Sequence, residues 1–215
     1  LTLGDRKDML TLATQMHRDA LVALTPDKTL RDVAPLIARA LMLAGKPDAA
    51  AGWIALLDSE NDRLQASVLL AALDLIAVDP ERDAQTQAAL QWLSRKTNEP
   101  EAALALGVYD AIGAVAPPDA HNAVQNMGAL PGRRPAPAEM QRLNSAEGDP
   151  ARKGEAALAI LNMIGPTGPE DLAPDVTATL LRALVKLDLR DAARQIGIEA
   201  LLTYKAPPPA TAANP

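Results

Sequence analysis

Apolar residues recur at helical spacing in consecutive segments of the chain, and short polar turns separate these segments. The segment 62–78 is apolar around nearly its whole circumference, which predicts a helix packed between neighbours on several sides. In 5–25 the apolar residues fall within one sector, which predicts a surface helix; they are Met9, Leu12, Ala13, Met16, Ala20 and Leu24.

The spacing and the turn residues together predict helices at 5–25, 30–44, 47–58, 62–78, 80–96, 99–115, 118–128, 137–146, 150–164, 170–187 and 189–204. Asp79-Pro80 and Asp149-Pro150 each place an acid at the N-cap and a proline at the first helical position, where its missing N–H is harmless. Thr29 and Asp32 form a looser capping pair. Because most connections are short, consecutive helices should be antiparallel neighbours.

Two segments interrupt this rhythm. The stretch 128–139 is dense in Pro and Gly, so we expect a hinge or long loop at 128–137. The end of the chain, 205–215, is rich in Pro and Ala and predicts a disordered or polyproline-like tail. The remainder, 1–204, is expected to be a single α-helical repeat domain.

The composition restricts the fold class. Hydrophobic residues make up 48% of the 215 residues, mostly Ala and Leu, whereas aromatic residues make up 2% and Phe is absent. A β-protein requires more β-branched and aromatic residues, so the fold class is all-α.

The charge pattern argues against two classes of partner. The chain has 21 basic and 27 acidic residues, interspersed, for a net charge of −6. A nucleic-acid binder needs clustered Lys and Arg, and an anionic membrane needs a polybasic segment, so we expect neither nucleic acid nor membrane insertion. The longest apolar stretch, 66–78, is too short to span a bilayer and contains Asp74.

Cysteine is absent, which excludes disulfides and cysteine-based metal sites. The chain begins at Leu1 without a leader sequence, so we expect either a mature form or a piece of a longer protein. A periplasmic protein whose leader has been removed and a cytoplasmic protein are both compatible with these features.

One segment of the sequence recurs. A shift of 143 residues places RALMLAGKPDAAAGWI (39–54) on RALVKLDLRDAARQIG (182–197). The matching residues are Arg39, Ala40 and Leu41 with Arg182, Ala183 and Leu184, and Asp48, Ala49 and Ala50 with Asp191, Ala192 and Ala193. A shorter repeat, EAALA, occurs at 101–105 and 155–159. The recurring unit is a helix, a tight turn and a second helix that opens on small residues, where two backbones can pass closely.

In these turns the chain resembles the tetratricopeptide-repeat superfamily, whose paired helices are joined in a similar way. The spaced aromatic positions of that family are mostly missing, and no strict 34-residue period is present. The resemblance implies antiparallel helical hairpins stacked as an α–α superhelix, with a compact helical bundle as the alternative.

No arrangement of residues predicts chemistry. His17 and His121 lie on separate predicted helices without a carboxylate at metal-ligand spacing, and we expect His17 to pack at the edge of an apolar face. The acidic segment 58–63 (DSENDR) lacks the ligand spacing of a calcium loop and is interpreted as a solvated helix cap. Arg133 and Arg134 could bind an anion, but a solubilised loop is the favoured interpretation.

Trp53, Trp92, Tyr109 and Tyr204 are all of the aromatic residues, and we expect them to be large core side chains. Trp53 should pack beside the small residues of its hairpin, against Leu41 or Leu64, while a binding role for Trp53 or Trp92 is the minority interpretation. Glycine-rich phosphate loops, Ser-His-Asp sets and paired catalytic carboxylates are not found. We therefore predict no catalytic, cofactor-binding or metal-binding residues and no cofactor.

A non-catalytic scaffold that binds another protein or a peptide is the function favoured by these features. Two alternatives remain: a non-catalytic helical domain of a larger, exported enzyme such as a cell-wall lyase, and a structural element that assembles with itself.

Overall fold

The computed structural model describes residues 16–57, 62–77 and 79–205, and within them the protein is entirely helical, as predicted. Eleven α-helices and three short 3₁₀ helices occur in these residues, without a β-strand. No helix in this part of the chain has the length and apolar character needed to cross a bilayer.

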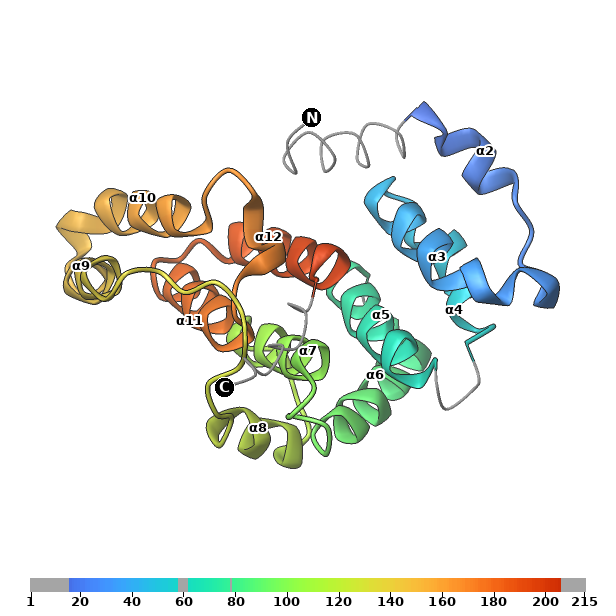
Figure 1. Cartoon of the computed structure of the whole chain (residues 1–215), viewed down its shortest axis with the longest axis horizontal. Coiled ribbons are helices and arrows are strands. Elements are labelled where there is room, and N and C mark those ends of the chain that lie inside the picture. The colour runs from blue at the N-terminus through green and yellow to red at the C-terminus, as the bar shows by residue number, and fades with distance from the viewer. Residues whose placement is uncertain (1–15, 58–61, 78, 206–215) are drawn as a thin grey trace, which may run out of the picture.

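Most of the helices form antiparallel hairpins (Figure 1). After the short α2 (Arg18–Ala23), the hairpins are α3 (Ala34–Leu43) with α4 (Pro47–Ile54), α5 (Arg63–Ile76) with α6 (Pro80–Leu93), α7 (Pro100–Ala111) with α8 (Pro118–Gln125), α9 (Pro137–Glu147) with α10 (Lys153–Ile164), and α11 (Pro174–Lys186) with α12 (Arg190–Thr203). The 3₁₀ helices η1 (Lys28–Val33), η2 (Pro150–Arg152) and η3 (Gly168–Asp171) precede α3, α10 and α11.

Two predicted helix starts are wrong, because other residues cap or begin those helices. Asp27, not Thr29, caps the entry to η1, because its carboxylate accepts a 2.7 Å hydrogen bond from the Thr29 N–H. The helix predicted at 170–187 is split into η3 and α11, because Pro174 begins a new helix where its missing N–H is harmless. At Asp149 the predicted cap is confirmed, with a 2.9 Å hydrogen bond from the Ala151 N–H.

Three hairpin turns share one hydrogen-bond pattern. After α3 the Lys46 N–H donates to the Leu41 carbonyl at 2.8 Å, and after α11 the Leu189 N–H donates to the Leu184 carbonyl at 2.9 Å. The same bond follows α7, between Ala114 N–H and the Tyr109 carbonyl at 3.3 Å. These are Schellman motifs, which require a left-handed residue.

The left-handed positions are Gly45 (φ 70°), Gly113 (φ 75°) and Asp188 (φ 60°). Gly45 and Asp188 are 143 residues apart, which is the shift found in the sequence. The sequence echo between 39–54 and 182–197 therefore corresponds to two turns with the same backbone geometry.

The hairpins stack in chain order only in the first half of the molecule. Helices α3 and α4 pack on α5, and α5 and α6 pack on α7. The last hairpin then returns to the middle, where α11 packs along α7, and α12 packs against α5 and α7 (Figure 1). The α9/α10 hairpin packs mainly against itself and η2, at one end of the molecule.

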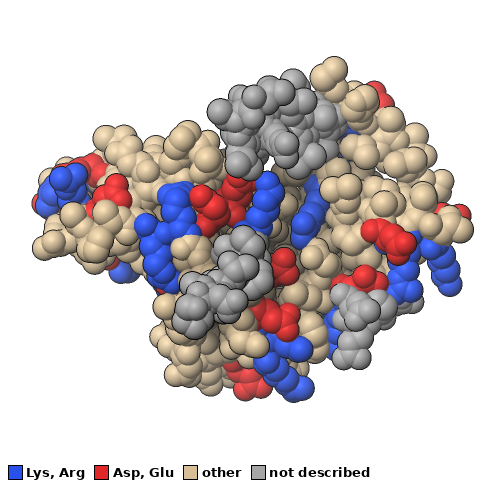
Figure 2. Space-filling view, in the orientation of Figure 1, with Lys and Arg blue, Asp and Glu red and all other residues tan. Residues whose placement is uncertain are grey.

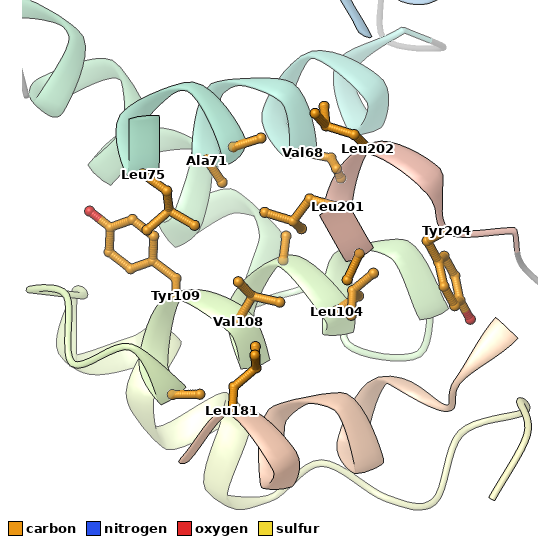
Figure 3. Close-up of a cluster of buried hydrophobic side chains, with 14 of the residues drawn as sticks. Val68, Ala71, Leu75, Leu104, Val108, Tyr109, Leu181, Leu201, Leu202 and Tyr204 are labelled. Atoms are coloured by element: carbon orange, nitrogen blue, oxygen red, sulfur yellow. The ribbon is translucent and has the colours of Figure 1, made fainter. Parts of the chain in front are cut away.

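Helix α7 lies at the centre of the core, with every residue from Ala102 to Tyr109 buried. Glycines allow two of its neighbours, α11 and α12, to approach closely. A Cβ added to Gly107 would lie 3.0 Å from the Ala178 Cβ of α11, and one added to Gly197 of α12 would lie 2.8 Å from the Val108 Cγ1. Leu104 and Val108 of α7 face Leu201 of α12 and Leu181 of α11 (Figure 3).

The prediction that 62–78 forms a helix packed on several sides is confirmed. The buried residues of α5 are Ala66, Ser67, Val68, Leu69, Ala71, Ala72, Leu73 and Leu75. They lie around most of the circumference of the helix, and α5 contacts α3, α4, α6, α7 and α12.

Candidate binding groove and polar clusters

A groove lies between α4, α5 and the start of α6, in the stacked half of the molecule. Its lining residues are Ala51, Ile54, Ala55, Leu57, Ala66, Leu70, Leu73, Asp79, Arg82 and Gln85. The floor and walls are aliphatic, and the polar residues lie together at the α6 side. The groove has a volume of about 280 Å³, near the lower limit of small-molecule sites, which suits one or two side chains.

Arg82 is the cation at the edge of this groove. Its side chain is only 14% exposed, yet its two ion pairs within the described residues are long: 3.8 Å to the Asp79 carboxylate and 3.9 Å to that of Asp48. Both distances exceed hydrogen-bond length, so N–H groups of the Arg82 guanidinium remain able to donate hydrogen bonds to a ligand. An aliphatic groove with such an arginine can hold an apolar side chain beside a carboxylate or carbonyl oxygen.

The histidines do not behave as the sequence analysis expects. His17 is exposed, so its predicted packing at the edge of an apolar face is wrong; the nearby α2 has no buried residue. His121 of α8 does have a carboxylate neighbour, since its Nδ1 lies 2.7 Å from Asp110 Oδ1. The other oxygen of Asp110 accepts a 3.0 Å hydrogen bond from Arg182. This cluster joins α7, α8 and α11 through charge and has no nucleophile among its three members.

Arg133 holds the 128–137 loop in place, which contradicts the interpretation of this arginine as part of a solubilised loop. Its Nε donates to both oxygens of Asp171, and its terminal nitrogens donate to the carbonyls of Met163 and Ile164 at 2.8 Å. The Arg133 backbone also forms two hydrogen bonds, with Asp171 and Ala173, as an isolated β-bridge. The guanidinium thereby caps the C-terminal carbonyls of α10.

The neighbours of Arg133 complete this attachment. Arg134 forms two 2.8 Å hydrogen bonds with the carboxylate of Asp175, at the start of α11. Gly132 has a φ of 149°, and a Cβ there would lie 2.5 Å from the Cα of Ala173. The expected hinge at 128–137 stays a prediction, but the loop is bonded to the segment before α11.

Both tyrosines are core side chains, as predicted, but their hydroxyls differ. The Tyr109 hydroxyl donates to the Asp74 carboxylate at 2.6 Å, and burial with this acid raises the pKa of Tyr109. The Tyr204 hydroxyl is buried without a hydrogen-bond partner among the described residues, and burial raises the pKa of Tyr204 to about 12. Its ring lies beside Leu104 and its hydroxyl points away from the apolar cluster (Figure 3).

The tryptophans occupy different environments. Trp53 is 1% exposed, so its prediction as a core residue is confirmed. Trp92 is half-buried, with the Arg63 guanidinium 5.0 Å and the Lys96 ammonium 5.7 Å from its ring centroid. Trp92 is therefore covered by two cations rather than presented as an open apolar anchor.

The acidic segment 58–63 can be followed only in part. Residues 58–61 lie outside the described residues, whereas Asp62 forms a 3.2 Å ion pair with Arg31. Asp62 stands at the N-cap position of α5 but forms no side-chain cap hydrogen bond, so the capping interpretation of this segment is not confirmed at Asp62. The described residues contain no group of three or more His, Cys, Asp or Glu that could hold a metal ion.

The predicted tail, 205–215, lies outside the described residues except for Lys205. The Lys205 N–H donates to the Glu170 carbonyl at 3.0 Å, which fixes the end of α12 to η3.

In comparisons with known proteins, no family model matches the chain, and no curated protein or solved structure matches it significantly.

Proposed function

We propose that the protein is a non-catalytic, tetratricopeptide-like scaffold that binds another protein or a peptide through the groove between α4, α5 and α6. The observation that carries this proposal is the combination in the groove of an aliphatic lining and the nearly buried Arg82, whose ion pairs are too long for hydrogen bonds. The likeness to tetratricopeptide repeats is supported by the recurring helix–turn–helix unit and its shared turn geometry.

The character of the groove favours a peptide over a metabolite or cofactor. Its described lining is mostly aliphatic and includes one cation, Arg82, whereas a small-molecule site encloses most of its ligand among several convergent polar groups. A peptide places one apolar side chain against Leu70 and Leu73 and directs an acidic side chain or its terminal carboxylate to Arg82. Hairpin arrays present extended surfaces suited to such partners.

A peptide-display selection on the purified chain tests this function. Enriched sequences should combine an aliphatic or aromatic residue with a neighbouring acid or a free C-terminus. Binding of a selected peptide, measured by fluorescence anisotropy, should weaken at least tenfold in Arg82→Ala and in Leu70→Glu.

The matched control is Arg95→Ala, which removes an exposed arginine near the end of the same hairpin. Its affinity for the selected peptide should equal that of the wild type. A selected peptide that binds all variants equally, or a selection without enrichment, would show that this groove is not a peptide site.

A further inference from the structure

Arg82, the cation of the groove, lies near two acids that belong to different helices. The carboxylate of Asp79, three residues before Arg82 at the start of α6, is 3.8 Å from the guanidinium. The carboxylate of Asp48, in the first turn of α4, is 3.9 Å from it. Because α4 and α6 both line the groove, the ion pair of Asp48 and Arg82 connects two of its walls.

Asp48 is a loose partner for this arginine. Its side chain is 94% exposed, whereas that of Arg82 is 14% exposed. A carboxylate in water contributes little to an ion pair, and at 3.9 Å no hydrogen bond holds it in place. A ligand carboxylate that enters the groove can form short hydrogen bonds with the guanidinium and thereby displace Asp48.

The charge around Arg82 opposes such a ligand. Two acids and one base, Asp48, Asp79 and Arg82, give the site a local net charge of −1. A carboxylate bound to the guanidinium lies close to Asp48, and like charges repel. On the face shown in Figure 2, groups of acidic and basic residues adjoin one another, and the whole chain carries −6. An acidic ligand therefore gains little from long-range attraction, and the charges beside Arg82 decide its affinity.

We propose that Asp48 is an autoinhibitory residue of the groove, which competes with the carboxylate of the ligand for Arg82. The inference rests on the proposed function, because it concerns access to the same site. It also narrows the class of partner. A single carboxylate beside an apolar side chain can replace Asp48, whereas each further acid in the ligand adds repulsion from Asp48 and Asp79. The partner segment is therefore apolar with one acid, rather than an acidic stretch.

The affinity of the selected peptide for Asp48→Asn, measured by fluorescence anisotropy, tests this competition. The variant should bind the peptide about two- to fivefold more tightly than the wild type, which is the range expected for an exposed ion pair. The same peptide with its carboxylate changed to an amide should bind the wild type and Asp48→Asn equally. A peptide with two further acids should bind the wild type more weakly than the selected peptide and gain more from Asp48→Asn.

The matched control is Asp119→Asn. Asp119 is exposed and follows Pro118 in the first turn of α8, as Asp48 follows Pro47 in the first turn of α4. Both substitutions remove an acid from a helix N-terminus, so their circular-dichroism melts should change by the same small amount. The affinity of Asp119→Asn for the selected peptide should equal that of the wild type.

The outcomes separate this inference from the proposed function. Unchanged or weaker binding in Asp48→Asn overturns the competition, and so does tighter binding of the amide peptide. The groove stands in both cases if Leu70→Glu and Arg82→Ala still weaken binding of the selected peptide. A peptide that binds those two variants like the wild type overturns the groove, and the role of Asp48 with it. Equal binding of the peptide with two further acids overturns the preference for a single acid.

Discussion

Replacing Trp53 by alanine should strongly destabilise the protein. Trp53 is 1% exposed and belongs to the same buried cluster as Leu41, which is 0% exposed, in the α3/α4 hairpin. Truncating a buried Trp removes transfer free energy and leaves a cavity, at a cost of about 3–5 kcal/mol in the free energy of unfolding. For a chain of this length, about 1 kcal/mol corresponds to roughly 2–4 °C, so the midpoint should fall by about 6–20 °C.

The second tryptophan provides the control. Trp92 is half-buried, and its ring is covered by Arg63 and Lys96. Trp92→Ala should cost only about 1–2 kcal/mol, because the side chain loses partial burial and two cation–π contacts of about 0.5–1 kcal/mol each. Its midpoint should therefore fall by about 2–8 °C.

Thermal melts followed by circular dichroism at 222 nm measure both effects, with urea unfolding as an independent estimate. Each variant retains one tryptophan, so fluorescence also reports the environment of the other. The emission of Trp92→Ala should be shifted to shorter wavelength relative to that of Trp53→Ala. A Trp53→Ala midpoint within about 2 °C of the wild type, or above that of Trp92→Ala, would refute the buried, stabilising role of Trp53.

The remaining predictions concern the two core tyrosines and the loop at Gly132. Tyr204→Phe should stabilise the protein by about 1 kcal/mol, because it removes a buried hydroxyl that has no partner among the described residues. Tyr109→Phe should instead destabilise the protein by about 1–3 kcal/mol, because the Asp74 carboxylate then loses its 2.6 Å hydrogen bond. Burial raises the pKa of Tyr204 to about 12, above its ordinary value near 10. The free energy of unfolding is therefore insensitive to this group below about pH 10 and falls as pH rises from about 10 to 12, so urea titrations should show a smaller alkaline loss in Tyr204→Phe. Equal alkaline losses in the two proteins would contradict this assignment. Gly132→Ala should lower the melting midpoint by more than about 5 °C. The added Cβ would lie 2.5 Å from the Ala173 backbone, at a φ that L-residues rarely adopt. A melting midpoint equal to that of the wild type would refute this close approach.

Much of the local structure could be predicted from the sequence. Helices and turns depend on residues close together along the chain, so apolar spacing and Pro or Asp caps located most of the elements. The recurrence at 143 residues also identified two turns of the same geometry, since a Schellman motif is completed within six residues. Gly45 and Asp188 occupy the same left-handed position in these turns. The boundary between η3 and α11 was missed, because Pro174 was interpreted as lying inside the helix predicted at 170–187 and it is instead the first residue of α11.

The order in which the hairpins pack was decided only by the tertiary structure. Hydrophobic burial has no direction, so the apolar faces of α7 and α11 do not specify one another in the sequence. Their pairing depends on where small residues permit close approach, as at Gly107 against Ala178. Periodicity marked α5 as a helix packed on several sides, but α7, which is buried along most of its length, has apolar residues without a distinct face and gave no comparable signal.

The polar clusters likewise exist only in the folded chain. Asp110 meets Arg182 across 72 residues, and Arg133 meets Asp171 across 38, distances at which sequence spacing carries no information. In the same way, Arg82 reaches the apolar groove only because α4, α5 and α6 converge there. The sequence determined which helices form and where each turns, because those choices are local; which charges pair and which apolar faces stay open was decided by the packing of helices distant along the chain.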